Sequence, residues 1–212
     1  MTATSCRSTS ARTVSLWCWA EVSARGIRVG AVCDCRPVSA QAFVDESGRR
    51  ARYYVCAAVV ADENVDAVRR LARSFCLPGQ RRWHFVHERD SRRRQIVDAL
   101  VSSGAVAALV FHGRGDDTAV RADSFHRMVR QLLDRNVGRL VIESREGRDH
   151  LDRQVLVDEL RGQPEGFGYD HMPAHSDPLL WVADAVAWCS SAGGAWGERI
   201  QSLVTHTERV TD

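Results

Sequence analysis

The chain has 212 residues, enough for a domain with a substantial core, and its 44% hydrophobic and 26% charged content is ordinary for a globular protein. A formal net charge of +2 is too small to argue for nucleic-acid binding by itself. All the basic residues are arginine. A GC-rich genome explains this bias better than phosphate recognition does, although arginine pairs well with phosphate oxygens.

The seven cysteines exclude two common kinds of site. No two of them are spaced CxxC, so neither a zinc ribbon nor a thioredoxin-like site is supported. Cys56 and Cys189 lie in apolar runs and are expected to be core thiols. No apolar run approaches the roughly 20 residues of a membrane span. We therefore expect a cytoplasmic protein, with no signal peptide and no membrane association.

Residues 1–40 differ from the rest of the chain. They begin with a Ser/Thr/Arg-rich stretch, contain four of the seven cysteines, and show strand-like patterns only at 14–21 and 27–32. We expect a poorly ordered or atypical N-terminal extension. An alternative is an upstream stretch translated from a wrongly chosen start codon. Residues 41–206 are expected to form a single domain.

From residue 41 onward, β-branched runs alternate with amphipathic segments, which predicts an α/β domain that begins with a hairpin. The expected strands are 42–45, 53–61, 105–112, 138–144 and 169–172, with a turn at 46–50. The expected helices begin at 62, 91, 118, 149 and 178, and a weaker final helix covers 196–205.

Acidic residues occur where these strands end and on the late helix. Asp45 closes an apolar strand, Glu143 lies near the end of strand 138–144, and Asp177 and Asp184 belong to the helix that begins near 178. Sites in α/β sheets gather where strands end. Carboxylate oxygens suit Mg²⁺ and Mn²⁺, and such ions can activate water for phosphodiester cleavage. We therefore predict Asp45, Glu143 and Asp184 as catalytic metal ligands, with Asp177 assisting.

The two acids of the first strand have a structural alternative. Asp-Glu-Ser-Gly is a good turn sequence, and aspartate often opens turns. Neighbouring residues on a strand point to opposite faces, so Glu46 is expected to face solvent if Asp45 faces a site.

The later acids have alternatives as well. Asp184 lies among apolar helix neighbours, and burying a carboxylate is costly unless a charge, a hydrogen bond or a metal compensates it. A backbone amide or an arginine would serve as well as a metal. Asp177 suits the N-cap of the helix. Glu143 could pair with Arg145 or Arg148.

The segment 81–94 interleaves arginines with aromatic residues. Arginine on phosphates with an aromatic on bases is a common way to hold single strands, so Arg81, Arg82, Trp83 and His84 are predicted to bind nucleic acid. His84 could also position a metal-bound water. The alternatives are a solvated helix face at 92–94 and a histidine packed beside Trp83.

The histidines give a third, weaker possibility. A zinc hydrolase could be built from His84, His87, Glu88, His171 and His175, but their spacing matches no established zinc motif.

Three segments together resemble the bacterial domain-of-unknown-function 3800 family over residues 41–195. They are Phe43-Val44-Asp45-Glu46-Ser47-Gly48 with the Tyr-rich strand after it, Trp83-His84-Phe85, and the helix Leu179 to Ala187 around Asp184. The resemblance implies a ribonuclease H-like fold, in which a mixed sheet with a leading β-hairpin is flanked by helices. It further implies an acidic metal site with Asp45 as first-strand ligand and Asp184 as late-helix acid. Glu143 stands where such folds often use aspartate.

The leading hypothesis is a Mg²⁺- or Mn²⁺-dependent nuclease or phosphodiester-processing enzyme that acts on DNA or RNA. The alternative is a non-catalytic nucleic-acid-binding or scaffold domain with a degenerate acidic site.

Overall fold

The structure is a computed structural model that describes residues 22–23, 26–27, 39–49, 51–145, 147–161 and 166–211. The chain divides into two units, Met1–Arg36 and Pro37–Asp212. In the first unit, β1 (Val22–Ser23) pairs antiparallel with β2 (Gly26–Ile27). The rest of the predicted extension, up to residue 38, lies outside the described residues.

The described residues of the second unit form a six-stranded sheet in the order β7-β6-β3-β4-β5-β8. Antiparallel pairing joins β3 to β4 and β4 to β5, whereas β6 is parallel to β3, β7 to β6 and β8 to β5. The sheet is therefore mixed and begins with a hairpin, as predicted. The strands are β3 (Ala40–Arg49), β4 (Arg52–Ala61), β5 (Ala107–Arg114), β6 (Val137–Glu143), β7 (Gly168–Met172) and β8 (Val204–Arg209).

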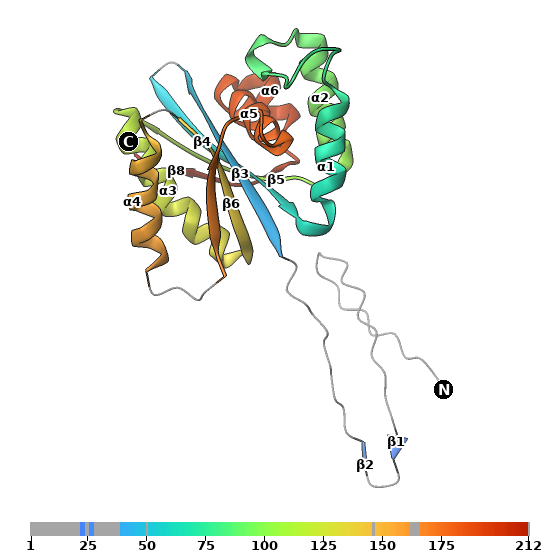
Figure 1. The fold of residues 1–212 in the computed structure, drawn as a ribbon, viewed down its shortest axis with the longest axis vertical. Coiled ribbons are helices and arrows are strands. Elements are labelled where there is room, and N and C mark those ends of the chain that lie inside the picture. Colours follow the sequence, from blue (N-terminus) through green and yellow to red (C-terminus); the bar gives the residue numbers. More distant parts are fainter. Residues whose placement is uncertain are drawn as a thin grey trace. The chain divides into compact units, whose positions relative to one another are not determined.

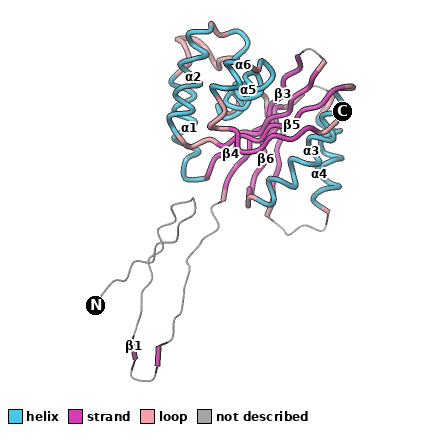
Figure 2. The backbone as a smooth tube through the Cα atoms, turned by 180° about the vertical axis from the view of Figure 1, so that it is seen from behind, coloured by secondary structure: helices cyan, strands magenta, loops and turns pink. Residues whose placement is uncertain are grey.

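Helices cover both faces of this sheet (Figure 1; Figure 2). Packed against one face are α1 (Asp62–Ser74), the short 3-10 helix η1 (Phe85–His87), α2 (Asp90–Ser103), α5 (Pro178–Ala192) and α6 (Gly194–Arg199). Against the other are α3 (Asp117–Asp134) and α4 (Asp149–Leu160).

Successive strand residues serve two different cores. Phe43 and Val141 pack in the core beneath α5, whereas Val44 and Ile142 pack in the core beneath α3 and α4. This alternation follows from the period of two along a strand. It also decides on which face each polar residue of β3 and β6 lies. Cys56 is a buried free thiol in the α5 core, as expected.

The hairpin is longer than predicted, and the predicted turn at 46–50 is wrong. Residues 46–49 continue β3, with Asp45 opposite Cys56 and Arg49 opposite Arg52. Ala51, with a φ of 58°, adopts the left-handed conformation next to the reversal. The turn signal in the sequence is overridden here because residues 46–49 continue to pair with β4, which satisfies their backbone hydrogen bonds within the sheet.

Helix α5 is buried on all sides from Pro178 to Ala187 and packs across β3 and β4. Its start matches the prediction: the Asp177 side chain caps it by accepting a hydrogen bond from the Leu179 N–H at 3.0 Å, and Pro178 occupies the first turn. Among the described residues, no helix is both long and apolar enough to cross a membrane.

The C-terminal prediction is wrong in part. The helix expected over 196–205 ends at Arg199 as α6, and the chain then forms β8 up to Arg209. Exposure alternates along β8, and the strand gains a ladder of backbone hydrogen bonds from β5. A pairing partner distant in the sequence therefore outweighs the weak local helix signal.

Candidate functional site

Asp45 and Glu143 lie on neighbouring parallel strands and face the same side of the sheet. The register pairs Val44 of β3 with Ile142 of β6, so the residues that follow them are adjacent. Two positions earlier, Phe43 and Val141 both pack beneath α5. Alternation therefore directs both carboxylates towards α5, from the middle of β3 and from the end of β6.

Asp184 is the acid that α5 brings to this face. Its side chain is nearly buried, at 9% exposure, and its Oδ2 accepts a hydrogen bond from the Phe85 N–H at 2.9 Å. The His84 Nδ1 lies 3.2 Å from the same oxygen. This contact is an ion pair by distance, although its alignment is poor for a hydrogen bond. Residues 84 and 85 thus fix one oxygen of Asp184.

The three acids interact electrostatically. Burial raises the pKa of Asp45 well above its usual range, and the charges of Glu143 and Asp184 raise it further. Burial also raises the pKa of Glu143; the Arg82 charge opposes this rise and Asp184 adds to it. Within the described residues, no ion pair joins Asp45 or Glu143 to an arginine. The cluster therefore holds more negative charge than its neighbours neutralise.

The oxygens of this cluster are not packed as a closed ligand shell. In the part of the chain that the structure describes, the side chains whose ligand atoms all lie within 4.8 Å of one another are Asp149, Asp152 and His171, not the three acids under α5. One oxygen of Asp45 accepts a hydrogen bond from the Glu46 N–H at 2.7 Å. The three acids thus lie on the same face of the sheet and interact electrostatically. Their oxygens are nevertheless farther apart than the ligands of a single ion.

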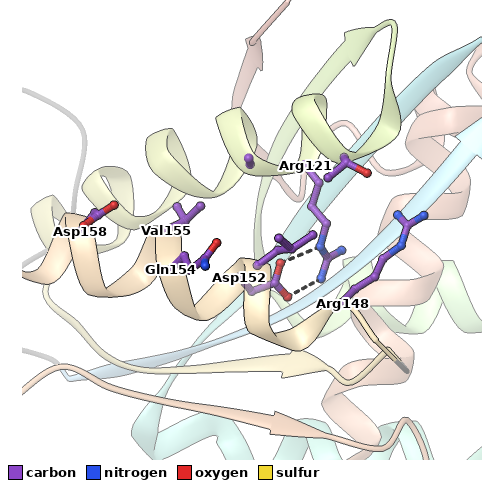
Figure 3. Close-up of a pocket in the computed structure, with 9 residues that line it drawn as sticks. Arg121, Arg148, Asp152, Gln154, Val155 and Asp158 are labelled. Carbon is purple, nitrogen blue, oxygen red and sulfur yellow. Dashed lines mark hydrogen bonds and ion pairs between the residues drawn. The ribbon is translucent and has the colours of Figure 1, made fainter.

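The group at Asp149, Asp152 and His171 belongs to a compensated network on the opposite face of the sheet. Arg121 reaches from α3 to α4 and donates from Nε and Nη2 to the two oxygens of Asp152, both at 2.8 Å (Figure 3). Asp149 accepts from the Ser144 hydroxyl at 2.6 Å and from a backbone N–H at 2.8 Å. Although Asp152 is buried, its bonds to Arg121 and His171 lower its pKa. Since its carboxylates are already bonded, this group suits an ion-pair network better than a metal ion.

Beside this network, α3 and α4 line a cavity of about 250 Å³ (Figure 3). Glu46 completes the network from β3, where it pairs with both Arg121 and Arg145. The expectation that Glu46 faces solvent is therefore wrong: it is only 8% exposed, because α3 and α4 cover the face to which it points.

Two predicted site residues have structural roles instead. Asp177 caps α5 and pairs with Arg69, whose Nη2 lies 2.6 Å from Oδ2, so its oxygens are not directed at the acid cluster. Trp83 is 1% exposed, and its indole N–H donates to the Ala72 carbonyl at 2.8 Å. A side chain so enclosed cannot stack on a base, so the predicted substrate role of Trp83 is corrected to a core role.

The other residues of that segment remain accessible. Arg81 is exposed, Arg82 is half-buried within electrostatic range of Glu143, and the His84 side chain is 40% exposed beside Asp184. The fold does not bring the predicted zinc histidines together. The ring centroids of His84 and His87 are 4.9 Å apart, but His171 is bonded to Asp152 on the opposite face of the sheet. The zinc hypothesis is therefore not supported by this arrangement.

Sequence reasoning missed Arg121, and it named Arg145, the arginine that follows β6, only as a possible partner of Glu143 and not of Glu46. A signal for Arg121 was present, because it lies four residues before Phe125 on the apolar side of α3, where a charge needs a partner. No comparable signal marks Arg145, whose partner Glu46 is distant in sequence.

No protein-family model matches the chain, and no curated protein matches its sequence. Among solved structures, the chain is similar to one in the PCNA:RNase HII complex from Archaeoglobus fulgidus, with a TM-score of 0.51 and 13% identity over 76% of each chain. At this identity the similarity concerns the fold alone. Together with the strand order, it shows that the chain has a ribonuclease H-like α/β fold.

Proposed function

We propose that this chain is a divalent-metal-dependent, nuclease-like enzyme that cleaves phosphodiester bonds in nucleic acid. The observation that carries the proposal is the gathering of Asp45, Glu143 and Asp184, from two adjacent strands and a helix distant in sequence, on one face of the sheet. The structural neighbour is a ribonuclease by name, which favours the same class of chemistry. A PCNA-like partner is not part of the proposal.

The donor set fits Mg²⁺ or Mn²⁺. All three side chains offer hard oxygen ligands. Burial and neighbouring negative charge raise the pKa of Asp45 and of Glu143, so their ionised forms are disfavoured, and a divalent cation would offset that excess of negative charge. When bound, such an ion supplies Lewis acidity to the attacking water and to the leaving oxygen.

The chain's own groups around the acids have separate roles. Glu143 and Asp45 provide ligand oxygens from rigid strands, and Asp184 has one oxygen held by the Phe85 amide. The half-exposed His84 lies beside that carboxylate, which raises the pKa of the imidazole. His84 is thus placed to hold a proton at the solvent side of the site. Arg82, near Glu143, presents a positive charge for a phosphate.

A second candidate is a nucleic-acid-binding domain without catalysis. The three acids are spaced more widely than the ligands of a single ion, which favours this candidate. The charges of Arg82 and Arg145 favour it as well, because they partly offset the negative charge of the acids. Membership of the domain-of-unknown-function 3800 family remains a prediction that is compatible with either candidate.

Cleavage of labelled substrates by the full chain tests the proposal. Single-stranded RNA, single-stranded DNA and an RNA–DNA hybrid would be incubated with Mn²⁺, with Mg²⁺ or with EDTA. We expect cleavage only with metal, and an Asp184→Asn variant that is folded but slower by about 100-fold or more.

The matched control is Asp123→Asn, because Asp123 is an exposed aspartate on α3. This variant should cleave like the wild type. Undiminished cleavage by Asp184→Asn would refute the assignment. No cleavage of any substrate, despite metal binding at the acids, would favour the binding-domain candidate.

A further inference from the structure

A second polar surface lies at the ends of β4, β5 and β8, away from the acids. Here a hollow of about 80 Å³ is lined by Arg52, His112, Gly113, Arg114 and Arg209. The register places Arg52 directly opposite Arg114, and His112 beside Arg209 on the parallel neighbour β8. None of the residues that line the hollow is acidic.

The arrangement of these arginines is unfavourable without a counter-ion. Like charges directly opposite one another on paired strands are destabilising. Neither Arg52 nor Arg114 forms an ion pair with a described residue, and both are exposed. Burial, together with the charges of Arg52 and Arg209, lowers the pKa of His112, so positive charge converges on the imidazole. An anion with several oxygens, such as a phosphate, would bridge the two opposed guanidinium groups.

A larger pocket adjoins this hollow and shares His112 with it. Its volume is about 260 Å³, and it lies between the strands and the ends of α5 and α6. The rings of Tyr54 and His112 contact each other with centroids 5.4 Å apart and planes tilted by 32°, and they contribute an aromatic surface. Polar side chains, Ser190, Gln201 and Thr207, also line the pocket. An aromatic surface with a few polar groups is typical of a site for a flat heterocycle.

We propose that the two hollows together form a nucleotide-binding site, in which Arg52 and Arg114 hold a phosphate and the base lies against Tyr54 and His112. The site uses none of the three acids. On strand geometry, Arg52 at its phosphate end lies roughly 15 Å from Asp45, and Tyr54 at its base end lies roughly 8 Å from it. The site therefore goes beyond the proposed function and does not depend on a metal. The nucleotide could be free, or it could be one unit of a nucleic-acid strand.

The test measures binding in EDTA, where metal-dependent cleavage cannot contribute. A short fluorescein-labelled oligothymidylate is titrated with the full chain and followed by fluorescence anisotropy. The double variant Arg52→Gln/Arg114→Gln should bind about tenfold more weakly. Its plot of log affinity against log salt should also be shallower by about 0.7, the contribution of one phosphate contact on a single strand.

The matched control removes two arginines elsewhere. Arg70→Gln/Arg73→Gln deletes the same charge from exposed positions of α1. We expect it to keep nearly the full affinity. An equal loss in the two double variants would show that net charge alone drives binding, and would overturn the proposal. No measurable binding by the wild type, or unchanged binding by Arg52→Gln/Arg114→Gln, would overturn it as well.

Competition distinguishes the two sources of the nucleotide. A nucleoside monophosphate that displaces the oligothymidylate completely would support a site for free nucleotides. Displacement by an unlabelled oligonucleotide alone would support a contact with a strand. If inorganic phosphate competed as well as the nucleoside monophosphate, the assignment of the base to Tyr54 and His112 would be wrong.

Discussion

Asp45 and Glu46 are neighbours on β3 and are equally buried, at 8% exposure each, yet their surroundings are opposite. Glu46 points towards α3 and pairs with Arg121 and Arg145. Asp45 points towards α5, where burial and then the charges of Glu143 and Asp184 raise its pKa. The strand period of two places one acid in a neutralised network and the next in an acidic cluster.

The contrast shows that burial alone does not reveal what a carboxylate does. A buried charge that is paired on all sides contributes to the connection between a strand and its helices, and removing one partner is costly. A buried charge that faces other charges of the same sign makes the fold less stable unless a cation is supplied. The two faces of β3 should therefore respond in opposite directions to the loss of a charge.

The largest expected effect is on the α3 side. Replacing Arg121 by Met removes the buried counter-charge that Glu46 and Asp152 share, and leaves Glu46 only the more exposed Arg145. Removing one member of a buried ion pair costs about 3–5 kcal/mol. Urea denaturation should show a loss of that size. The exposed pair Arg127–Glu208 provides the control, because Arg127→Met should cost about 1 kcal/mol or less. A loss of stability for Arg121→Met as small as that for Arg127→Met would contradict the proposed difference between the two faces of β3.

The second effect concerns metal on the α5 side. Mn²⁺ at about 100 times its dissociation constant should stabilise the folded chain by about 2.7 kcal/mol, which raises the midpoint by about 5–10 °C. Asp45→Asn should remove this shift in differential scanning calorimetry. Asp152→Asn tests the rival ligand group at α4. A shift that survives Asp45→Asn but disappears in Asp152→Asn would place the metal in the other network.

The smallest effect concerns pH without metal. The folded-state pKa of Asp45 is raised above its unfolded value, so the folded state binds the proton more tightly. Ionised Asp45 therefore lowers stability above its folded pKa, and this loss is recovered as pH falls through that pKa towards the unfolded value near 4. Asp45→Asn should stabilise the metal-free chain at pH 7–8 by about 1 kcal/mol and flatten this part of its stability–pH curve. Denaturation in EDTA at several pH values would measure both changes. Lower stability of Asp45→Asn at pH 8 would argue that Asp45 has a compensating partner.

Much of the fold followed from local patterns in the sequence. Helices α1 and α5 begin where capping and periodicity predicted, and the hairpin of β3 and β4 was expected from its β-branched residues. The acids of the candidate site were also predictable, because Asp184 interrupts an otherwise apolar helix.

The rest depended on contacts between distant residues. The partners of Glu46 come from α3 and from the loop after β6, which no local pattern specifies. Trp83 has a large apolar ring system and one hydrogen-bond donor, so from sequence it suits stacking on a base and packing in the core equally well. Only the hydrogen bond from its indole N–H to the Ala72 carbonyl identifies it as a core residue. Strand β8 exists because β5 offers a free edge, and only the assembled sheet reveals that edge.

The position of α5 across β3 and β4 has a consequence during synthesis on the ribosome. The face that this helix covers contains Phe43 and Val60, and it stays open to water until the chain has been extended to about Ala192. Nascent chains that expose apolar strands for so long are prone to aggregate. A competent domain should therefore form only after α5 has left the ribosome, and truncation before Pro178 should give insoluble product unless a chaperone shields the uncovered sheet.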